Sequence, residues 1–305
     1  MRIIFMGTPQ FAVASLEALV EAGCDIAAVV TAPDKPAGRG QKLSESAVKQ
    51  YADAHTLKVL QPEKLKAPAF LEELNQLNAD LYVVVAFRML PEAVWSIPPK
   101  GTINLHASLL PQYRGAAPIN WVLMNGEQES GVTTFFIRQD IDTGDILFTE
   151  KVTLTGQETA GELHDRLMEK GAGLLVKTVK GIESGRYNKN PQLNLAEGIE
   201  LKLAPKIFKE DCLIDWNQPA GAIYNKIRGL SPVPTAYTLL NDKIFKIFRS
   251  ELELTDPGVK PGSFLTDHKT YLKFAAADGL ISVTDVQLEG KKRLGIAEFL
   301  RGVKL

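Results

Sequence analysis

The sequence predicts a protein of the α/β class, with a mainly parallel sheet in its first half and a small antiparallel β-domain at its end. In the first half, short β-branched runs alternate with stretches whose apolar residues recur at helical spacing. Such alternation is typical of parallel strands covered by helices on both faces, a Rossmann-like arrangement. Residues 206–305 hold closely spaced strand-like runs with turn residues between them. A chain of 305 residues is long enough for two domains.

The N-terminal domain is expected to span residues 1–187. Its predicted strands are rich in Ile, Val and Phe, and they cover residues 2–6, 25–30, 81–86, 102–105 and 132–137. Apolar residues between the first two strands, from Phe11 to Val20, fall on one face of a helix. A longer helix is predicted over residues 160–181.

Residues 188–205 are irregular and contain Gly, Asn and Pro, so they are interpreted as a linker. The C-terminal domain, residues 206–305, is predicted to begin with a helix over residues 220–227. Its strand-like runs cover residues 236–240, 244–249, 270–275 and 280–287. A small antiparallel β-barrel of the OB-like kind fits this pattern.

Composition and charge exclude several classes of protein. Cys24 and Cys212 lie far apart in the sequence, and the four histidines lack the close spacing of zinc ligands, so we expect neither a disulfide nor a metal. No apolar run approaches the roughly 20 residues that span a bilayer, so we expect a cytoplasmic protein without membrane contact. The net charge is −1, although residues 206–305 carry a small excess of Lys and Arg.

Two polar side chains stand together at the end of one predicted strand. Side chains alternate between the faces of a strand, so Asn104 and His106 point one way while Ile103 and Leu105 point the other. Ligands of open α/β sheets bind at the carboxyl ends of the strands. This position favours a functional site, although a core or capping role suits the same two residues.

The loop of residues 140–145 follows the strand predicted over residues 132–137. It brings carboxylates, Asp142 among them, to the same edge of the sheet, or it is a turn that Asp side chains hold. It is not an EF-hand, because Asp145 and Lys151 stand where the pattern needs Gly and Glu. The first half also has no complete dinucleotide fingerprint, and no G-x-S-x-G motif surrounds Ser108.

Several spaced motifs carry a resemblance to a known family. They are NLHASLLP at residues 104–111, YRGAAPI at 113–119, GVT at 131–133, DTGD at 142–145, GTP at 7–9, PDKPAGRG at 33–40 and IDW at 214–216. On these motifs the chain resembles the folate-dependent formyltransferases. Within that family it is most similar to the members that formylate the methionine of initiator tRNA.

The resemblance implies a reaction and a catalytic set. The formyl group of 10-formyltetrahydrofolate would pass to the α-amino group of initiator methionyl-tRNA, a step of translation initiation. Asn104 and His106 would bind the formyl oxygen as it becomes an oxyanion, and Asp142 would orient the imidazole and help to move the amine proton. An amide N–H and a ring N–H suit that task, because both can be aimed where negative charge develops.

The resemblance also implies binding residues for folate. A mostly apolar cleft with a few hydrogen-bonding groups suits a pterin ring. The residues expected to form it are Phe87, Leu90, Ser108, Leu109, Leu110, Pro111 and the backbone near Asp140.

For the tRNA, the resemblance points to the loop of residues 31–49, which carries Lys35, Arg39 and Lys42. In the C-terminal domain, Lys243, Lys246 and Arg249 alternate with Ile244 and Ile247, so we expect one cationic and one buried strand face. Both regions also suit an ordinary solvated surface. A monomer is expected.

The chain departs from the family pattern at three places: residues 86–91, Gln112 and Ala107. An alternative function is formyl transfer to a nucleotide-linked amino sugar, which related enzymes perform with the same Asn-x-His and Asp signatures. The Arg39 loop and the form of residues 142–145 favour the tRNA substrate. A tRNA-binding module without activity is a second alternative, but all three catalytic residue types are present.

Overall fold

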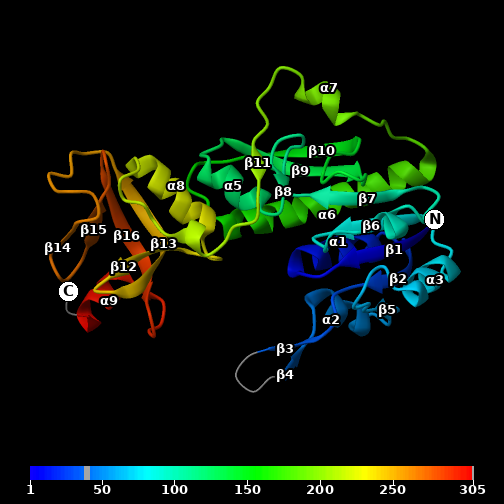
Figure 1. Ribbon diagram of the computed structural model, residues 1–305, viewed down its shortest axis with the longest axis horizontal. Helices are drawn as coiled ribbons and strands as arrows, with labels where there is room; N and C mark the ends of the chain where they lie inside the picture. The colour runs from blue at the N-terminus through cyan, green and yellow to red at the C-terminus, as the bar shows by residue number, and fades with distance from the viewer. Residues whose placement is uncertain (38–41, 304–305) are drawn as a thin grey trace. The chain divides into compact units, whose positions relative to one another are not determined.

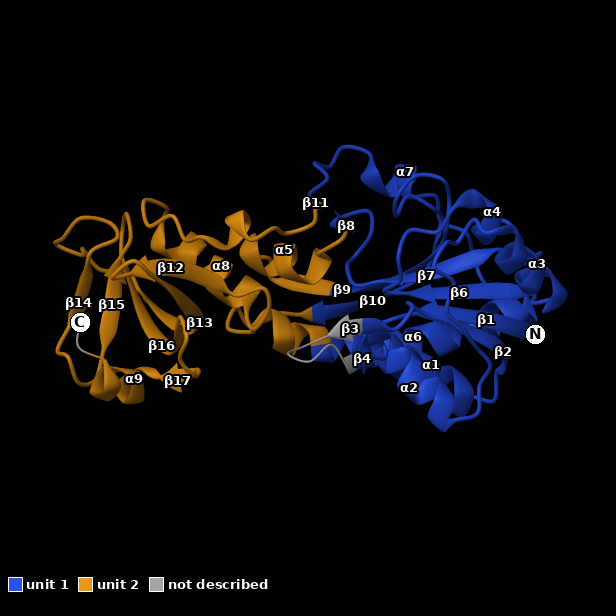
Figure 2. Ribbon diagram, turned by 60° about the horizontal axis from the view of Figure 1, so that its bottom comes forward, with its two compact units in different colours: residues 1–114, 131–152, 165–202 blue, residues 115–130, 153–164, 203–305 orange. Residues whose placement is uncertain are grey.

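The computed structural model describes residues 1–37 and 42–303, which form two compact units (Figures 1 and 2). Unit 1 consists of residues 1–114, 131–152 and 165–202, and unit 2 consists of residues 115–130, 153–164 and 203–305. Each unit is therefore assembled from three separate stretches of chain. Residues 115–130 and 153–164, which we assigned to the N-terminal domain from the sequence, pack within unit 2.

Unit 1 is built on a mixed, mainly parallel sheet of seven strands in the order β10-β9-β7-β6-β1-β2-β5. The strands are β1 (Arg2–Gly7), β2 (Asp25–Val30), β5 (Val59–Leu60), β6 (Leu81–Val85), β7 (Thr102–His106), β9 (Glu129–Phe136) and β10 (Ile146–Thr153). Neighbouring strands from β5 to β7 pair in parallel, and β9 pairs with β7 in the antiparallel sense. The predicted fold class and its five strands are confirmed.

Helices cover both faces of this sheet (Figure 1). They are α1 (Gln10–Glu21), α2 (Ala47–Ala54), α3 (Pro68–Gln76), α4 (Glu92–Trp95) and α6 (Ala160–Ser184), and a short helix, α7 (Gln192–Ala196), follows α6. A short hairpin, β3 (Lys35–Ala37) and β4 (Lys42–Ser44), precedes α2. In the part of the chain that the structure describes, no helix is long and apolar enough to cross a membrane.

The two faces of β7 have different surroundings. On one face Leu105 packs so closely on α6 that a Cβ added to Gly171 would lie 2.8 Å from a Leu105 methyl group. On the other face Asn104 stands in register with Val84, which belongs to an apolar cluster with Phe70 of α3 and Val94 of α4. Asn104 and His106 therefore lie on the α3–α4 side of the sheet, as the alternation predicts.

Unit 2 holds an antiparallel half-barrel sheet in the order β12-β13-β16-β15-β14, with β17 paired to β16. Its strands are β12 (Ala236–Leu240), β13 (Lys243–Glu253), β14 (Phe264–Thr266), β15 (Leu272–Ala275), β16 (Leu280–Leu288) and β17 (Leu294–Gly295). Helices α5 (Pro118–Met124), α8 (Ala220–Leu230) and α9 (Ile296–Gly302) complete it, with β8 (Arg114–Gly115), β11 (Leu203–Ala204) and a 3₁₀ turn (Glu210–Cys212). Trp216 stacks on Phe274 in its core, with ring centroids 4.7 Å apart.

The single cationic face predicted for β13 is wrong. Lys243 and Lys246 are three residues apart, so they point to opposite faces of the strand, and Lys243 shares its face with the fully buried Ile247. Ile244 is only half-buried. Arg249 follows a β-bulge and makes an ion pair with Glu162. A repeat of three does not match the two-residue period of a strand.

The segment predicted to be a linker, residues 188–205, contains α7 and β11. Asn190 also forms an antiparallel bridge with Ile146, with backbone N–H to O distances of 2.9 Å in both directions. This part of the chain is therefore held against the sheet of unit 1 at its first residues.

Glu158 stabilises a turn of unit 2 by accepting hydrogen bonds from the backbone N–H groups of Thr155 (2.8 and 3.0 Å) and Gly156 (3.0 Å). Burial by itself would raise the pKa of this carboxyl, but the backbone donors outweigh it and lower the pKa from 4.5 to about 2. A lowered pKa stabilises the fold above the unfolded value and loses that effect as the pH falls through the folded value.

We therefore expect Glu158→Gln to destabilise the protein by about 3 kcal/mol at pH 7 and progressively less between about pH 4.5 and pH 2. Urea denaturation of both proteins at pH 7, 4 and 3 measures the difference in the free energy of unfolding. A difference that does not change with pH would contradict this role of the carboxylate.

Candidate active site

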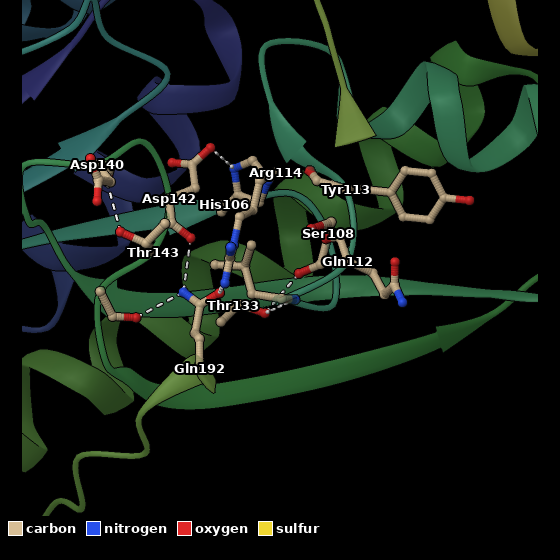
Figure 3. A network of polar contacts seen from close by, with 12 residues as sticks. His106, Ser108, Gln112, Tyr113, Arg114, Thr133, Asp140, Asp142, Thr143 and Gln192 are labelled. Atoms are coloured by element: carbon tan, nitrogen blue, oxygen red, sulfur yellow. Dashed lines mark hydrogen bonds and ion pairs between the residues drawn. The ribbon is translucent and has the colours of Figure 1, made fainter. Parts of the chain in front are cut away.

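His106 is the centre of a polar network at the end of β7 (Figure 3). Its side chain is buried, with 6 % of the residue surface exposed. The ring Nε2 lies 2.8 Å from the carbonyl oxygen of Tyr113, and the ring Nδ1 lies 3.7 Å from Oδ2 of Asp142. The carboxylate that we expected at this edge of the sheet is thus next to the imidazole.

This geometry selects one tautomer of the imidazole. A carbonyl oxygen only accepts hydrogen bonds, so the Nε2 of His106 must carry a proton and donate it to Tyr113. In the neutral ring the Nδ1 then has a lone pair that faces Asp142. A proton taken up at Nδ1 would lie beside a carboxylate that stabilises the resulting cation. The pair is arranged to accept a proton. In this structure the ring N–H that we expected to bind the formyl oxygen is directed at the carbonyl of Tyr113 instead.

Asn104 stands one side-chain position before His106 on the same face of β7. By register it lies between Val84 of β6 and Phe135 of β9. Its side chain is half-buried, and within residues 1–37 and 42–303 its amide makes no hydrogen bond. Its two N–H donors are therefore available to a ligand beside His106.

The loop that carries Asp142 is tightly fixed. Asp142 has the left-handed backbone angle φ 55°, which typically costs a non-glycine residue roughly 1–2 kcal/mol. The hydroxyl of Thr143 donates to the carbonyl of Asp140 at 3.0 Å, and Arg138 forms an ion pair of 2.6 Å with Asp145. A Cβ added to Gly144 would lie 1.6 Å from the carbonyl oxygen of Phe136, so only glycine fits there.

We expect Gly144→Ala to lower the rate of the reaction by roughly a hundredfold, because the added methyl must push the loop and Asp142 away from β9. Gly173→Ala is the matched control, since a Cβ at Gly173 of α6 meets nothing within 4 Å. Steady-state rates and melting temperatures of both variants are to be compared. Equal rates for the two would show that the loop tolerates the displacement.

The loop between β7 and β8 is held by its own hydrogen bonds. The Ser108 hydroxyl donates to the carbonyl of Gln112 at 2.7 Å, and Thr133 of β9 donates to the carbonyl of Ser108 at 2.7 Å. Thr133 also accepts from the N–H of Leu110 at 3.2 Å. Tyr113, at φ 60°, ends the loop with its carbonyl directed at His106. Ser108 is fully buried, so its hydroxyl serves the loop itself.

Two apolar clusters lie on the same side of the sheet as Asn104. Leu90 is buried in the α3–α4 cluster, and Phe87 packs against that cluster. Leu110 is buried with Phe135 and Ile146 in a second, smaller cluster. The three residues expected to provide an apolar wall for folate thus lie in or against these clusters.

The other residues expected to bind folate are placed differently. Pro111 is buried, Leu109 is half-buried and Asp140 is exposed. Leu109 packs on Gly131, where an added Cβ would lie 2.4 Å from a Leu109 methyl group. That Cβ would also lie 2.3 Å from the carbonyl oxygen of Glu150 in β10, so the close packing here requires glycine at position 131.

Among the residues expected to bind tRNA in the N-terminal domain, Lys35 is exposed at the start of β3. Lys42 begins β4 and pairs through its backbone with Ala37. Arg39 lies outside the described residues. Sequence reasoning assigned no role to Tyr113 or Thr133, although both belong to the motifs at residues 113–119 and 131–133.

The site combines the two N–H donors of Asn104 with the imidazole–carboxylate pair of His106 and Asp142. Such groups, at the edge of a mainly parallel sheet and beside apolar clusters, are typical of enzymes that transfer acyl groups. A family model described as formyl transferase matches residues 1–179, and a second, described as the formyl transferase C-terminal domain, matches residues 206–304. The chain belongs to the formyl transferase family.

Relatives within this family are similar over the whole chain. The methionyl-tRNA formyltransferase of Bacteroides fragilis is 51% identical over 310 residues, which cover 100% of this chain and 96% of the relative. The methionyl-tRNA formyltransferase of Parabacteroides distasonis is 51% identical over 311 residues, with the same two coverages.

Solved structures share the fold at low sequence identity. The sugar 3N-formyl transferase WlaRD has a TM-score of 0.68 at 20% identity, covering 96% of this chain and 99% of that chain. HypX from Aquifex aeolicus in complex with tetrahydrofolic acid has a TM-score of 0.64 at 20% identity, covering 100% of this chain and 48% of that chain.

Proposed function

We propose that this protein transfers the formyl group of 10-formyltetrahydrofolate to the α-amino group of initiator methionyl-tRNA, in the cytoplasm and as a monomer. The observation that carries the proposal is similarity along the full chain, 51% identity over 100% of its residues, to a relative named methionyl-tRNA formyltransferase. The pairing of His106 with Asp142, beside an Asn104 amide that makes no hydrogen bond in the described part of the chain, supports the chemistry.

In the proposed reaction the amine nitrogen of methionine attacks the formyl carbon. A new C–N bond forms, and the formyl oxygen takes the negative charge. The Asn104 amide donates a hydrogen bond to that oxygen, which stabilises the tetrahedral intermediate more than the ground state. The half-buried position of Asn104 between two strands keeps this donor in place before the substrate arrives.

The attacking nitrogen must lose a proton before the intermediate collapses. The lone pair on Nδ1 of His106 accepts it, directly or through a water molecule, and Asp142 stabilises the imidazolium. The bond between the formyl carbon and N10 of the folate then breaks, and N10 takes a proton, which the imidazolium can return. The products are formyl-methionyl-tRNA and tetrahydrofolate, and no step requires a metal.

The binding residues are proposed with the same function. Phe87, Leu90 and Leu110 would contribute apolar surface for the folate, in line with their clusters. Leu109, Pro111 and the backbone near Asp140 would complete that site, whereas Ser108 would act by shaping the loop. For the tRNA backbone we retain the six cationic residues Lys35, Arg39, Lys42, Lys243, Lys246 and Arg249, which would contact phosphates individually.

The test is formyl transfer from 10-formyltetrahydrofolate to charged initiator tRNA, charged elongator tRNA and a nucleotide-linked amino sugar offered as competing acceptors. We expect the initiator tRNA to be formylated fastest by a wide margin. Transfer to the sugar alone would replace the acceptor, and it would keep the roles of Asn104, His106 and Asp142. No transfer from the folate to any acceptor would refute the proposed function.

A further inference from the structure

The segment of residues 190–202 lies between the two matched family regions, which end at residue 179 and begin at residue 206. It contacts both loops that surround His106 in unit 1. We propose that this segment is a strap that holds the active-site loops, and that Gln192 is a positioning residue that fixes both partners of the His106 imidazole. The inference rests on the proposed function, because it assigns Gln192 to the same reaction.

The Gln192 side chain is almost completely buried, with 2 % of the residue exposed, and its amide is fully used (Figure 3). Its Nε2 donates to the carbonyl oxygens of Asp142 at 2.9 Å and Gly144 at 2.8 Å. Its Oε1 accepts from Nε and Nη2 of Arg114 at 3.0 and 2.7 Å. Two donors and both lone pairs of one side chain are thus committed to two loops.

These contacts lead to both nitrogens of the imidazole. Gln192 binds the carbonyl of Asp142, whose carboxylate lies next to Nδ1 of His106. It also binds Arg114, the residue after Tyr113, whose carbonyl accepts the Nε2 proton. Asp142 and Tyr113 both have left-handed backbone angles, φ 55° and φ 60°, which surrounding contacts must maintain. One buried amide therefore links the two residues that orient the ring.

The other end of the strap, residues 200–202, also forms hydrogen bonds with the loop before β8. The N–H of Tyr113 donates to the carbonyl of Lys202 at 2.6 Å. The side chain of Gln112 donates to the carbonyl of Glu200 at 2.9 Å and accepts from the N–H of Lys202 at 2.8 Å. Gln112, which departs from the family pattern, uses both ends of its amide to hold the strap. The strap is thus anchored at both ends.

The experiment compares two variants of the full-length protein. Gln192→Met keeps the length of the side chain and removes every hydrogen bond, and Gln192→Glu keeps the acceptor for Arg114 but replaces the donors to Asp142 and Gly144. Leu193→Ala is the control, because Leu193 is in the same helix with 84 % of its surface exposed. The measurements are kcat, the KM for each substrate and the melting temperature.

We expect both Gln192 variants to lower kcat roughly ten- to a hundredfold with unchanged KM values, since displaced groups lose alignment rather than binding. Leu193→Ala should behave like the unaltered protein. A purely structural Gln192 would instead lower the melting temperature and leave kcat per folded molecule unchanged, which would overturn the proposal.

A double-mutant cycle with Asp142→Ala distinguishes this inference from the proposed function. Single-turnover rates are measured for each single variant and for the pair. If Gln192 acts on the imidazole through Asp142 and Tyr113, Gln192→Met causes a clearly smaller loss in the Asp142→Ala background than in the unaltered protein. Additive losses would overturn the strap and leave the role of Asp142 intact. An Asp142→Ala variant with an unchanged rate would overturn both assignments.

Discussion

Asp142→Ala is expected to lower the rate of formyl transfer by roughly a hundred- to ten-thousandfold, the usual range for removing a general acid–base group. Asp142 is the carboxylate beside Nδ1 of His106, 3.7 Å away, where the proton of the attacking amine is expected to arrive. Without it the imidazolium loses the carboxylate that stabilises its charge, and the tetrahedral intermediate returns to reactants more often. Binding of tRNA should be retained, because the substitution leaves the cationic residues unchanged.

The matched control for this prediction is Asp145→Asn, in the same loop. Asp145 forms an ion pair with Arg138, whose side chain is 61% exposed, so its loss should affect transfer far less. Single-turnover formylation and a filter-binding assay with charged initiator tRNA measure the two properties separately. Unchanged transfer by Asp142→Ala would rule out the catalytic assignment, and parallel loss of transfer and binding would indicate a role in binding the tRNA.

Asn104→Ala is expected to lower kcat by roughly a hundred- to thousandfold, the effect of removing one preorganised donor to an oxyanion. The physical reason is the position of the amide. It makes no hydrogen bond within the described residues, and it lies two residues before His106 on the same face of β7. Truncation leaves the backbone pairing of β7 with β6 and β9 in place, so the fold should persist.

Asn104→Asp provides the control for shape. It keeps the size of the side chain and replaces the donor with a carboxylate that would repel the developing negative charge, so the loss should be at least as large. Steady-state kinetics with both substrates varied, together with circular dichroism, test this. A variant that raises KM and keeps kcat would show that Asn104 binds the ground state as strongly as the transition state.

Much of the fold could be predicted because most of the strands have a distinct composition. The runs at residues 25–30 and 236–240 coincide with β2 and β12 to the residue. β10 was missed because its second half mixes Thr, Glu and Lys, and β5 was missed because two residues form no pattern. Residues 188–205 were interpreted as a linker from their Gly, Asn and Pro content, although their hydrogen bonds to distant loops are invisible to local composition.

The site, too, could be predicted only in part from the sequence. Alternation along one strand placed Asn104 and His106 on a common face, and the structure confirms that placement through the register with Val84 and Phe135. The carbonyl of Tyr113 could not be predicted as a partner of His106, because it depends on one left-handed residue in a loop. Gln192 was equally inaccessible, since it lies 50 residues beyond Asp142 and its role is defined only by tertiary contacts.

The interleaved composition of the two units limits how the gene can be divided. A fragment that ends near residue 187 would include residues 115–130 and 153–164 without the rest of unit 2. Helix α5 would then expose Val122 and Leu123, which are buried in the full chain, and Met124 would lose the core against which it packs. Such a fragment should aggregate, and split-protein reporters or domain exchanges with relatives would require at least four junctions rather than one.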